Sequence, residues 1–563
     1  MKVKLPKDLR GTKFPQAFVI EMNDFDIDLF LPTLFFTVLS RGRGKARQIN
    51  KATNIEGYID SLSVHPALEG FSDPVGRKVL ERLVRTTLIT TGRVGRGKES
   101  EQIMSIVPYT LLAHKAGFPV TGSRLRGADA FIYHALRHNM QGADDRLQEA
   151  IVTIFGRGVT LGSMQELGGH YDGEADLDTL TRLSIAFLDG FQNTKPGLVR
   201  EKDVTPACPV LADELATDLL RFLFMYYRRM PIQAFTYHLL ALVNFELFIY
   251  TLKLVYAINA LVRDPQVLPC AMDTSLTVSP PQLYLDFTND AKGYSQEMAK
   301  ACIRRDVEMY QQYLISIMRL RLLDYYVEKL NHIPARRARV SAILDEASSG
   351  PLYLQRLLLL HSDPTLDLQI QSLAITDEGR IREANQLLDE DGKPQDEEEV
   401  VAWLEEIAGA AETDLDRVIN LLVEGQRDNA MKHVISWYWG VGGLKKPHGV
   451  LRGTPSSRQS WRYAPSNDLL AVLVQIAAAQ LTPRGSDLSP IRLQDFLAFL
   501  EKHYGILIDR PPDMFKGAEY AAAARDNLRA VLARLRQMGI FSDLSDDFTV
   551  QNLQPPYAQI RVR

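Results

Sequence analysis

The sequence predicts a mainly α-helical, multidomain protein with winged-helix-like modules at the N- and C-terminal ends. Three patterns indicate this fold. Apolar residues recur every three or four positions through residues 141–376, a basic turn separates two β-prone stretches near residue 90, and three helical patterns precede a hairpin pattern after residue 466. Hydrophobic residues make up 46% of the 563 residues and charged residues 24%, which are values typical of globular proteins.

The N-terminal module is expected to span residues 1–140. A helix is expected at 27–39, because Asp24, Asp26 and Asp28 precede an apolar run and acidic residues favour a helix start. A second helix, at 74–85, leads into the sequence TTLITT, the basic turn GRVGRGKES and the sequence QIMSIV. Helix, strand, turn and strand is the order of a winged helix.

The turn from Gly92 to Lys98 has a second interpretation. Its sequence, GRVGRGK, matches the phosphate-binding pattern GxxxxGK, and it follows a β-prone stretch. That pattern requires Ser or Thr next to hold magnesium, and Glu99 stands there. We therefore interpret the turn as the tip of a basic hairpin, and a nucleotide hydrolase or divergent nuclease built around it is the alternative.

An acidic helical core domain is expected at residues 141–376. Its apolar stretch at 232–262 is long enough to cross a membrane. Polar residues interrupt this stretch at depths where lipid would make each charge costly. These residues are His238, Asn244, Glu246, Lys253 and Asn259. We expect a buried central helix in which they are paired, and no association with a membrane.

Three shorter segments follow the core domain. Residues 377–399 are rich in Asp and Glu and are expected to form an acidic linker. Residues 400–439 are expected to be helical. Residues 440–465 are basic and rich in glycine, and we expect a loop.

A C-terminal winged helix-turn-helix is expected at residues 466–563. Helices are predicted at 467–480, from about Ser489 onward and at 518–538, followed by a strand, turn and strand at 541–552. On the third helix Arg525, Arg529 and Arg536 lie within about 40° of each other, beside an apolar arc. This arrangement is typical of a recognition helix, although Asp543, Asp546 and Asp547 in the following hairpin would repel phosphates.

Charge is strongly segregated along the chain, although the net charge is only −4. Residues 1–140 contain 21 basic residues (Lys and Arg) and 13 acidic residues (Asp and Glu). Residues 141–439 contain 28 basic and 45 acidic residues, and residues 440–563 contain 16 basic and 11 acidic residues. Basic ends of this kind favour contact with a polyanion such as double-stranded DNA. The candidate DNA-binding residues are Arg41, Arg43, Lys45, Arg47, Arg93, Arg96, Lys98, Lys445, Lys446, Arg525, Arg529 and Arg536.

The sequence shows no convincing catalytic or metal-binding pattern. His134 and His138 have a spacing that can bind metal, but HALRH lacks the glutamate of HExxH. We therefore expect no catalytic residues, no metal and no cofactor. The N-terminus has no apolar signal region, which favours a cytoplasmic location.

Several stretches resemble subunits of multigene bacterial anti-phage systems, in particular the methylation-associated defence system. These stretches are FDIDLFLPTLFF, LITTGRVGRGK, LYLDFTND with the following SQEMAKACIRRDVEMYQQYL, and RDNLRAVLARLRQMGIFSDLSDDF. The resemblance implies a non-catalytic subunit that binds DNA or bridges other subunits of a defence complex. A scaffold that binds only protein is the remaining alternative.

Overall fold

The computed structural model describes most of the chain. The described residues are 2–42, 44–46, 55–64, 69–91, 102–106, 110–114, 125–142, 144–161, 169–171, 181–182, 184–185, 188, 196–198, 206–266, 281–288, 290, 292–388, 394–395, 398–409, 411–444, 446–482, 488–542 and 551–558. The protein is mainly helical, as predicted, and its strands are short.

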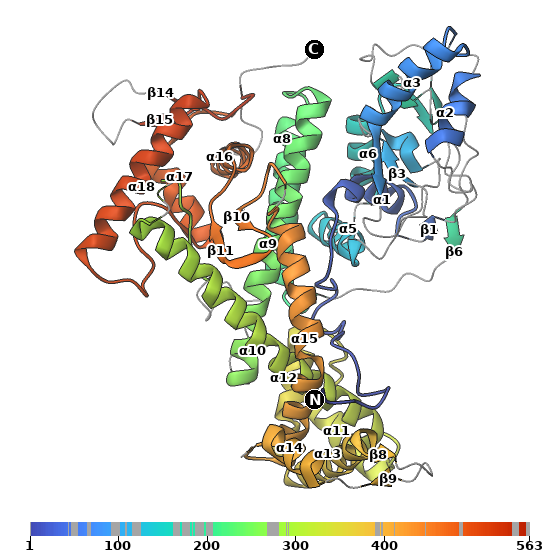
Figure 1. The fold of residues 1–563 in the computed structure, drawn as a ribbon, viewed down its shortest axis with the longest axis vertical. Helices are drawn as coiled ribbons and strands as arrows, with labels where there is room; N and C mark the ends of the chain where they lie inside the picture. The colour runs from blue at the N-terminus through green and yellow to red at the C-terminus, as the bar shows by residue number, and fades with distance from the viewer. Residues whose placement is uncertain are drawn as a thin grey trace.

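Three long helices form the centre of the molecule. They are α8 (Pro209–Tyr226), α9 (Ile232–Arg263) and α10 (Tyr294–Leu330). Figure 1 shows three lobes around them: an N-terminal lobe and a C-terminal lobe at one end, and a lobe built from α11 to α15 at the other. The N-terminus of the chain lies beside this third lobe, so the first residues cross the molecule before they enter the N-terminal lobe.

The N-terminal lobe combines helices with two-stranded antiparallel sheets, which pair β1 with β6, β2 with β3 and β4 with β5. Its helical elements are η1 (Ile27–Leu29), α1 (Phe30–Leu39), α2 (Ile55–Ser63), α3 (Pro74–Thr87), η2 (Leu111–His114), α5 (Ala128–Asn139) and α6 (Asp144–Phe155). Its strands are β1 (Gly44–Ala46), β2 (Leu88–Thr91), β3 (Gln102–Ile106), β4 (Val159–Leu161), β5 (Gly169–Tyr171) and β6 (Pro196–Leu198). The helices predicted at 27–39 and 74–85 and the strands on either side of the basic turn are confirmed.

The third lobe is built from helices around one small hairpin. Its elements are α11 (Pro334–Leu344), α12 (Gly350–Leu358), η3 (Leu359–Ser362), α13 (Pro364–Asn385), β8 (Leu387–Leu388), β9 (Pro394–Gln395), α14 (Glu398–Ala408) and α15 (Asp414–Val441). Helix α15 runs from this lobe back to the centre, where it packs along α10 and α9.

The C-terminal lobe contains a compact unit of helices and a three-stranded sheet. Its elements are β10 (Leu451–Thr454), β11 (Ser457–Tyr463), α16 (Asn467–Leu481), β12 (Ile491–Arg492), α17 (Leu493–Phe499), the π-helical turn η4 (Leu500–Tyr504), β13 (Ile506–Leu507), α18 (Ala518–Gln537), β14 (Phe541–Ser542) and β15 (Asn552–Leu553). The sheet order is β12-β15-β14, and all pairs are antiparallel. Strand β13 pairs in parallel with β7 (Leu283–Tyr284), which joins this unit to the start of α10.

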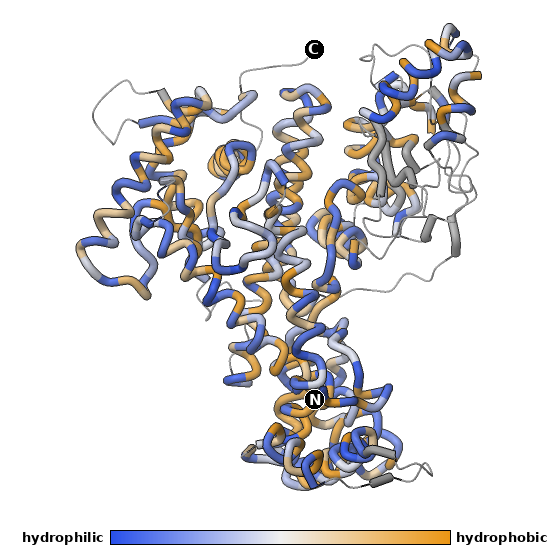
Figure 2. Tube along the Cα trace, viewed as in Figure 1, coloured by the Kyte–Doolittle hydropathy of each residue, from blue (hydrophilic) through white to orange (hydrophobic). Residues whose placement is uncertain are grey.

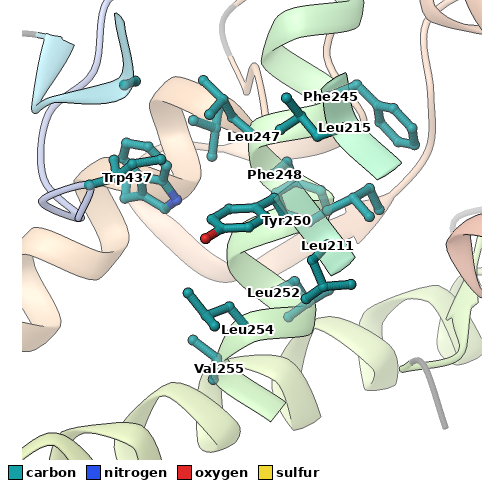
Figure 3. Packing of buried hydrophobic residues seen from close by; sticks show 14 of the residues in the cluster. Leu211, Leu215, Phe245, Leu247, Phe248, Tyr250, Leu252, Leu254, Val255 and Trp437 are labelled. Atoms are coloured by element: carbon teal, nitrogen blue, oxygen red, sulfur yellow. The ribbon is translucent and has the colours of Figure 1, made fainter. Parts of the chain in front are cut away.

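One hydrophobic core runs through the molecule, with α9 at its centre. Figure 3 shows Phe248 and Tyr250 of α9 among side chains from α8 and Trp437 of α15. The most apolar part of α9 is 89% buried, and Figure 2 shows hydrophobic residues along the central helices. By length and composition α9 is the one described helix that could cross a membrane. Its burial confirms the prediction of a core helix.

The polar side chains of α9 are paired, as predicted. His238 contacts Gln475 through its ring nitrogen Nδ1 at 2.7 Å, and Asn244 donates to the carbonyl of Val441 at 2.7 Å. Lys253 donates to Glu214 at 2.9 Å and to the carbonyl of His503 at 2.7 Å. Asn259 donates to the carbonyl of Met309 at 2.9 Å. Burial without such partners would cost several kcal/mol per group.

Glu246 belongs to a buried network that joins α9, α8 and η4. The Tyr504 hydroxyl lies 2.7 Å from both Asp218 and Glu246, and Asp218 also lies 2.7 Å from Nε2 of His503. Burial and the neighbouring charge of Asp218 raise the pKa of Glu246 well above its usual range. Burial opposes ionisation of Asp218 as well, but the hydrogen bond and charge of His503 hold its pKa below its usual range. One hydroxyl has one proton, so Tyr504 donates to ionised Asp218, and protonated Glu246 donates within the same network, to Tyr504 or directly to Asp218.

Two segments differ from their predictions. Residues 377–385, expected to begin an acidic linker, form the last turns of α13 instead, because Asp377 and Glu378 are buried against basic partners. Residues 440–465, expected to be a loop, contain the hairpin of β10 and β11 instead. The reason is that Trp461 and Tyr463 at its base are buried against the core, and Tyr463 donates to Asp306 at 2.7 Å.

Candidate nucleic-acid interface

Helix α18 is amphipathic, and its apolar face attaches it to the core. Ala524, Val531 and Leu535 are buried on this face. Asn527, which is also fully buried, accepts from the backbone N–H of Phe287 at 2.7 Å and donates to the carbonyls of residues 285 and 508. These bonds fix the helix against the segment that follows β7 and the segment that follows β13.

The three predicted arginines lie beside this apolar face, and all three are exposed. Arg529 pairs with Asp526 at 2.7 Å, and the Arg529 side chain remains 79% exposed. The guanidinium of Arg536 lies over the ring of Phe541 at 5.0 Å. No exposed large hydrophobic residue lies on this helix. The surface is therefore polar and basic, as contact with phosphates and base edges requires.

Arg534 lies beside this face but has a structural role. It donates to the carbonyl of Pro465 at 3.2 Å, and its guanidinium lies 5.2 Å from the ring of Phe287. Burial and the nearby charge of Arg452 lower the pKa of Arg534. Because Arg452 on β10 is exposed, it adds a positive charge close to α18.

The N-terminal hairpin is present, but its predicted contact residues lie outside the described part of the chain. Strands β2 and β3 pair in the register Leu88 with Ile106 and Thr91 with Gln102. Arg93, Arg96 and Lys98 lie between them, at 92–101, which the structure does not describe.

Two of the other predicted basic residues are engaged in ion pairs. Arg41 pairs with Asp145, and Lys446 pairs with Asp28 and lies 3.7 Å from Asp26. These contacts join parts of the fold and leave less charge for a ligand. Arg43, Arg47 and Lys445 lie outside the described residues, and the side chain of Lys45 on β1 is not described either.

Two features of the described side chains bear on catalysis: groups that could hold a metal ion, and carboxyl groups with shifted pKa values. Across the described ranges no group of three or more His, Cys, Asp or Glu side chains is arranged to hold a metal ion. Asp218 and Glu246 are buried, and both carboxyl groups hydrogen-bond to the Tyr504 hydroxyl. They stabilise the junction of three elements.

Sequence reasoning missed two features, one on α18 and one on α3. Asn527 interrupts the apolar arc of α18, and a polar residue in that position is a signal that buried backbone groups need a partner. Val75, Val79 and Leu83 on α3 follow an i, i+4, i+8 spacing that predicts a buried face. All three are exposed, at 72%, 47% and 38%.

The fold and this surface define a class: a mainly helical, three-lobed protein with a basic helix displayed on a helix-and-sheet unit. Within that class the chain belongs to a defined family, because the family model for the methylation-associated defense system protein MAD7 matches residues 7–557. The resemblance inferred from the sequence is thereby confirmed, and the chain is a component of a defence system. No curated protein and no solved structure gives a significant match.

Proposed function

We propose that this chain is a non-catalytic, cytoplasmic DNA-binding and assembly subunit of a prokaryotic anti-phage defence complex. One observation carries the proposal: Arg525, Arg529 and Arg536 form an exposed basic face on a helix whose other face is fixed to the core. A rigid helix with this arrangement can contact phosphates and guanine edges of double-stranded DNA.

The order of elements in the C-terminal unit supports a winged helix-turn-helix. Helix α16, strand β12, helices α17 and α18, and strands β14 and β15 follow each other, with the sheet order β12-β15-β14. In a helix-turn-helix the second helix of the motif enters the major groove. That position belongs to α18, the helix that carries the exposed arginines.

The DNA proposal is tested by the salt dependence of duplex binding. We expect Arg525→Ala, Arg529→Ala and Arg536→Ala together to lower the log-log salt slope by up to about 3, and to relax any sequence preference. A matched control replaces three exposed cations elsewhere, Arg337, Arg427 and Lys432, and should leave both unchanged.

The hairpin of β2 and β3 is proposed as a second DNA contact. Replacement of Arg93, Arg96 and Lys98 by alanine should also lower the slope by up to about 3, but without affecting sequence preference, because a hairpin tip is suited to the phosphate backbone. If both triple variants bind DNA as the parent does across a range of salt, the DNA proposal is wrong. The scaffold function then takes its place.

A non-catalytic role predicts no ATP or GTP hydrolysis by the purified protein. Glu99 stands where a phosphate-binding loop needs a magnesium-ligating hydroxyl. Turnover that Lys98→Ala abolishes would favour the nucleotide hydrolase instead.

The exposed stripe on α3 favours an additional function in assembly. Val75, Val79 and Leu83 form a continuous apolar row, and exposed rows of this kind indicate contact with a protein. Lys78 and Arg82 border the row, and neither has an acidic partner among the described residues. The complementary partner is an acidic amphipathic helix of another subunit of the same system.

The assembly surface is tested by coexpression with the other proteins of the same defence locus. Val79→Glu and the pair Lys78→Glu with Arg82→Glu should each weaken copurification of one subunit by about tenfold or more. Ile375→Glu is the control, because Ile375 on α13 is similarly exposed, at 57%. If the acidic pair variant binds every subunit as the parent does, the partner is not an acidic helix.

A further inference from the structure

A partly enclosed cavity of about 180 Å³ lies between the N-terminal segment and the helices α10 and α15. Its floor is aromatic and apolar. Phe14 and Phe18 come from the N-terminal segment and Tyr313 comes from α10, and the rings of Phe18 and Tyr313 meet edge to face at 6.4 Å. A second cavity, of about 360 Å³, adjoins the first and shares Lys13 and His433 with it.

The wall formed by residues 12–22 is held in place at both ends. The guanidinium of Arg321 donates to the carbonyls of four successive residues, 8 to 11, at 2.8 to 3.1 Å. At the other end the backbone N–H of Glu21 donates to the carbonyl of Arg126 at 2.9 Å. The cavity is thus built from fixed elements, which lowers the entropic cost of binding.

Positive charge dominates the rim. Arg10, Lys13, Arg126 and Arg321 line the two cavities, against one carboxylate, Glu21. Glu21 pairs with Lys13 at 2.5 Å and lies 3.6 Å from Arg126, which also pairs with Asp24. Even with both carboxylates counted, the rim keeps an excess of positive charge.

His433 lies close to the same positive charges. Burial, together with the charges of Arg126, Lys432 and Lys13, lowers the pKa of His433, although Glu21 acts in the opposite direction. The imidazole is therefore neutral near pH 7 and can donate a hydrogen bond to an anion at the rim.

We propose that this cavity binds a small aromatic anion, with its ring against Phe14, Phe18 and Tyr313 and its acidic group at the rim beside Lys13, Arg126 and His433. The size fits such a ligand, because an apolar cavity of about 150 Å³ holds benzene. An aromatic floor favours a flat ring, and the cations favour a carboxylate or phosphate. This proposal does not depend on DNA binding, which concerns α18 and the hairpin of β2 and β3.

Three probes with one ring and different charges test the proposal on the full-length protein. Indole-3-acetate is the anion, indole the neutral ring and tryptamine the cation. We expect calorimetry to rank them in that order of affinity, with the anion at least about tenfold tighter than the cation, as one charge-assisted hydrogen bond supplies. Equal affinities, or no binding of indole-3-acetate at millimolar concentration, would overturn the proposal.

Two variants test the positive charge at the rim and the volume of the cavity separately. Lys13→Glu changes a side chain that is 69% exposed, so folding is preserved, and it should lower the affinity for indole-3-acetate about tenfold while indole is unaffected. Ala430→Phe fills the space at a residue that lines both cavities and should abolish binding of all three probes. Arg427→Glu is the control, because Arg427 is exposed on α15 and lines neither cavity. If Arg427→Glu weakens anion binding as much as Lys13→Glu does, the charge effect is general and the site is not at this rim.

Discussion

Helices α3 and α18 occupy the two lobes at one end of the molecule, and both belong to regions of net positive charge. Their exposed faces differ. Helix α18 presents arginines and no large hydrophobic residue, whereas α3 presents Val75, Val79 and Leu83 beside its cations. Net charge alone therefore does not identify a DNA surface. The side chains between the cations decide whether a polyanion or a protein fits.

The two helices also differ in their attachment. Asn527 bonds α18 to two other segments, and the network of Tyr504, Asp218 and Glu246 fixes the neighbouring turn η4 to the central helices. Helix α3 packs chiefly against α2, and its start is capped by Asp73, an exposed residue. A firmly attached helix is suited to base recognition in double-stranded DNA, because contacts with base edges require a fixed geometry.

The largest expected effect comes from loss of the attachment of α18. Asn527→Ala leaves one buried N–H and two buried carbonyls without this partner, and should lower the free energy of unfolding by about 3 kcal/mol. Urea denaturation measures the loss. Asp526→Ala, next to it on the exposed side, is the control and should change stability little. Equal stability of the two variants would show that the bonds of Asn527 do not fix α18 to the core.

The second prediction concerns the pH dependence of the buried network. The folded-state pKa of Glu246 is raised, so its contribution to stability is full below the unfolded pKa near 4.5 and is lost as pH rises toward the folded value. Glu246→Gln keeps a donor to Tyr504 and cannot ionise. Its stability relative to the parent should therefore increase above pH 4.5, by up to about 1.4 kcal/mol per pH unit.

Thermal unfolding at several pH values measures this difference. Glu424→Gln is the control, because Glu424 pairs with Arg427 on an exposed face. A parallel pH dependence of the Glu246→Gln variant and the parent would show that Glu246 is ionised in the folded protein. The single-proton arrangement around Tyr504 would then be wrong.

Local sequence patterns predicted the bounds of several elements well. Helices α3 and α18 and the strands β2 and β3 lie close to their predicted bounds, because each pattern depends on neighbours in the sequence. The prediction of a linker was wrong for residues 377–385, and for a different reason. The sequence pattern predicted that Asp377 and Glu378 are solvated. In the structure they pair with Lys329 and Arg417, which are distant in the sequence.

The candidate site could be predicted only in part, because local sequence patterns define a helix face but not its partners. The arginine face of α18 follows from the helical period alone. The exposure of Val79 does not, because an apolar spacing predicts burial and says nothing about whether a partner is present in the same chain. The second helix of the C-terminal unit also begins later than Ser489 predicts, at Leu493, since Ile491 and Arg492 pair with β15.

A smaller effect is expected from a single arginine of α18. Arg529 and Arg427 are matched: each is exposed and each pairs with an acidic residue three positions earlier. Arg529→Ala should lower the salt slope of duplex binding by about 0.9, the value for one phosphate contact, whereas Arg427→Ala should leave it unchanged. Fluorescence anisotropy across a salt series measures both. Equal slopes for the two variants would remove Arg529 from the interface.

The smallest effect is expected from the stripe on α3, and it tests the comparison most directly. Val79→Ser and Leu83→Ser together remove exposed methyl groups, so the free energy of unfolding should change by less than about 0.5 kcal/mol. Duplex affinity and its salt slope should also stay unchanged, because valine and leucine side chains contribute nothing to phosphate neutralisation. Leu80→Ala, one position along the helix and fully buried, should by contrast cost about 3 kcal/mol within this lobe. If the double serine variant loses DNA affinity while its stability is intact, α3 lies on the duplex and the assignment of its exposed stripe to protein binding is wrong.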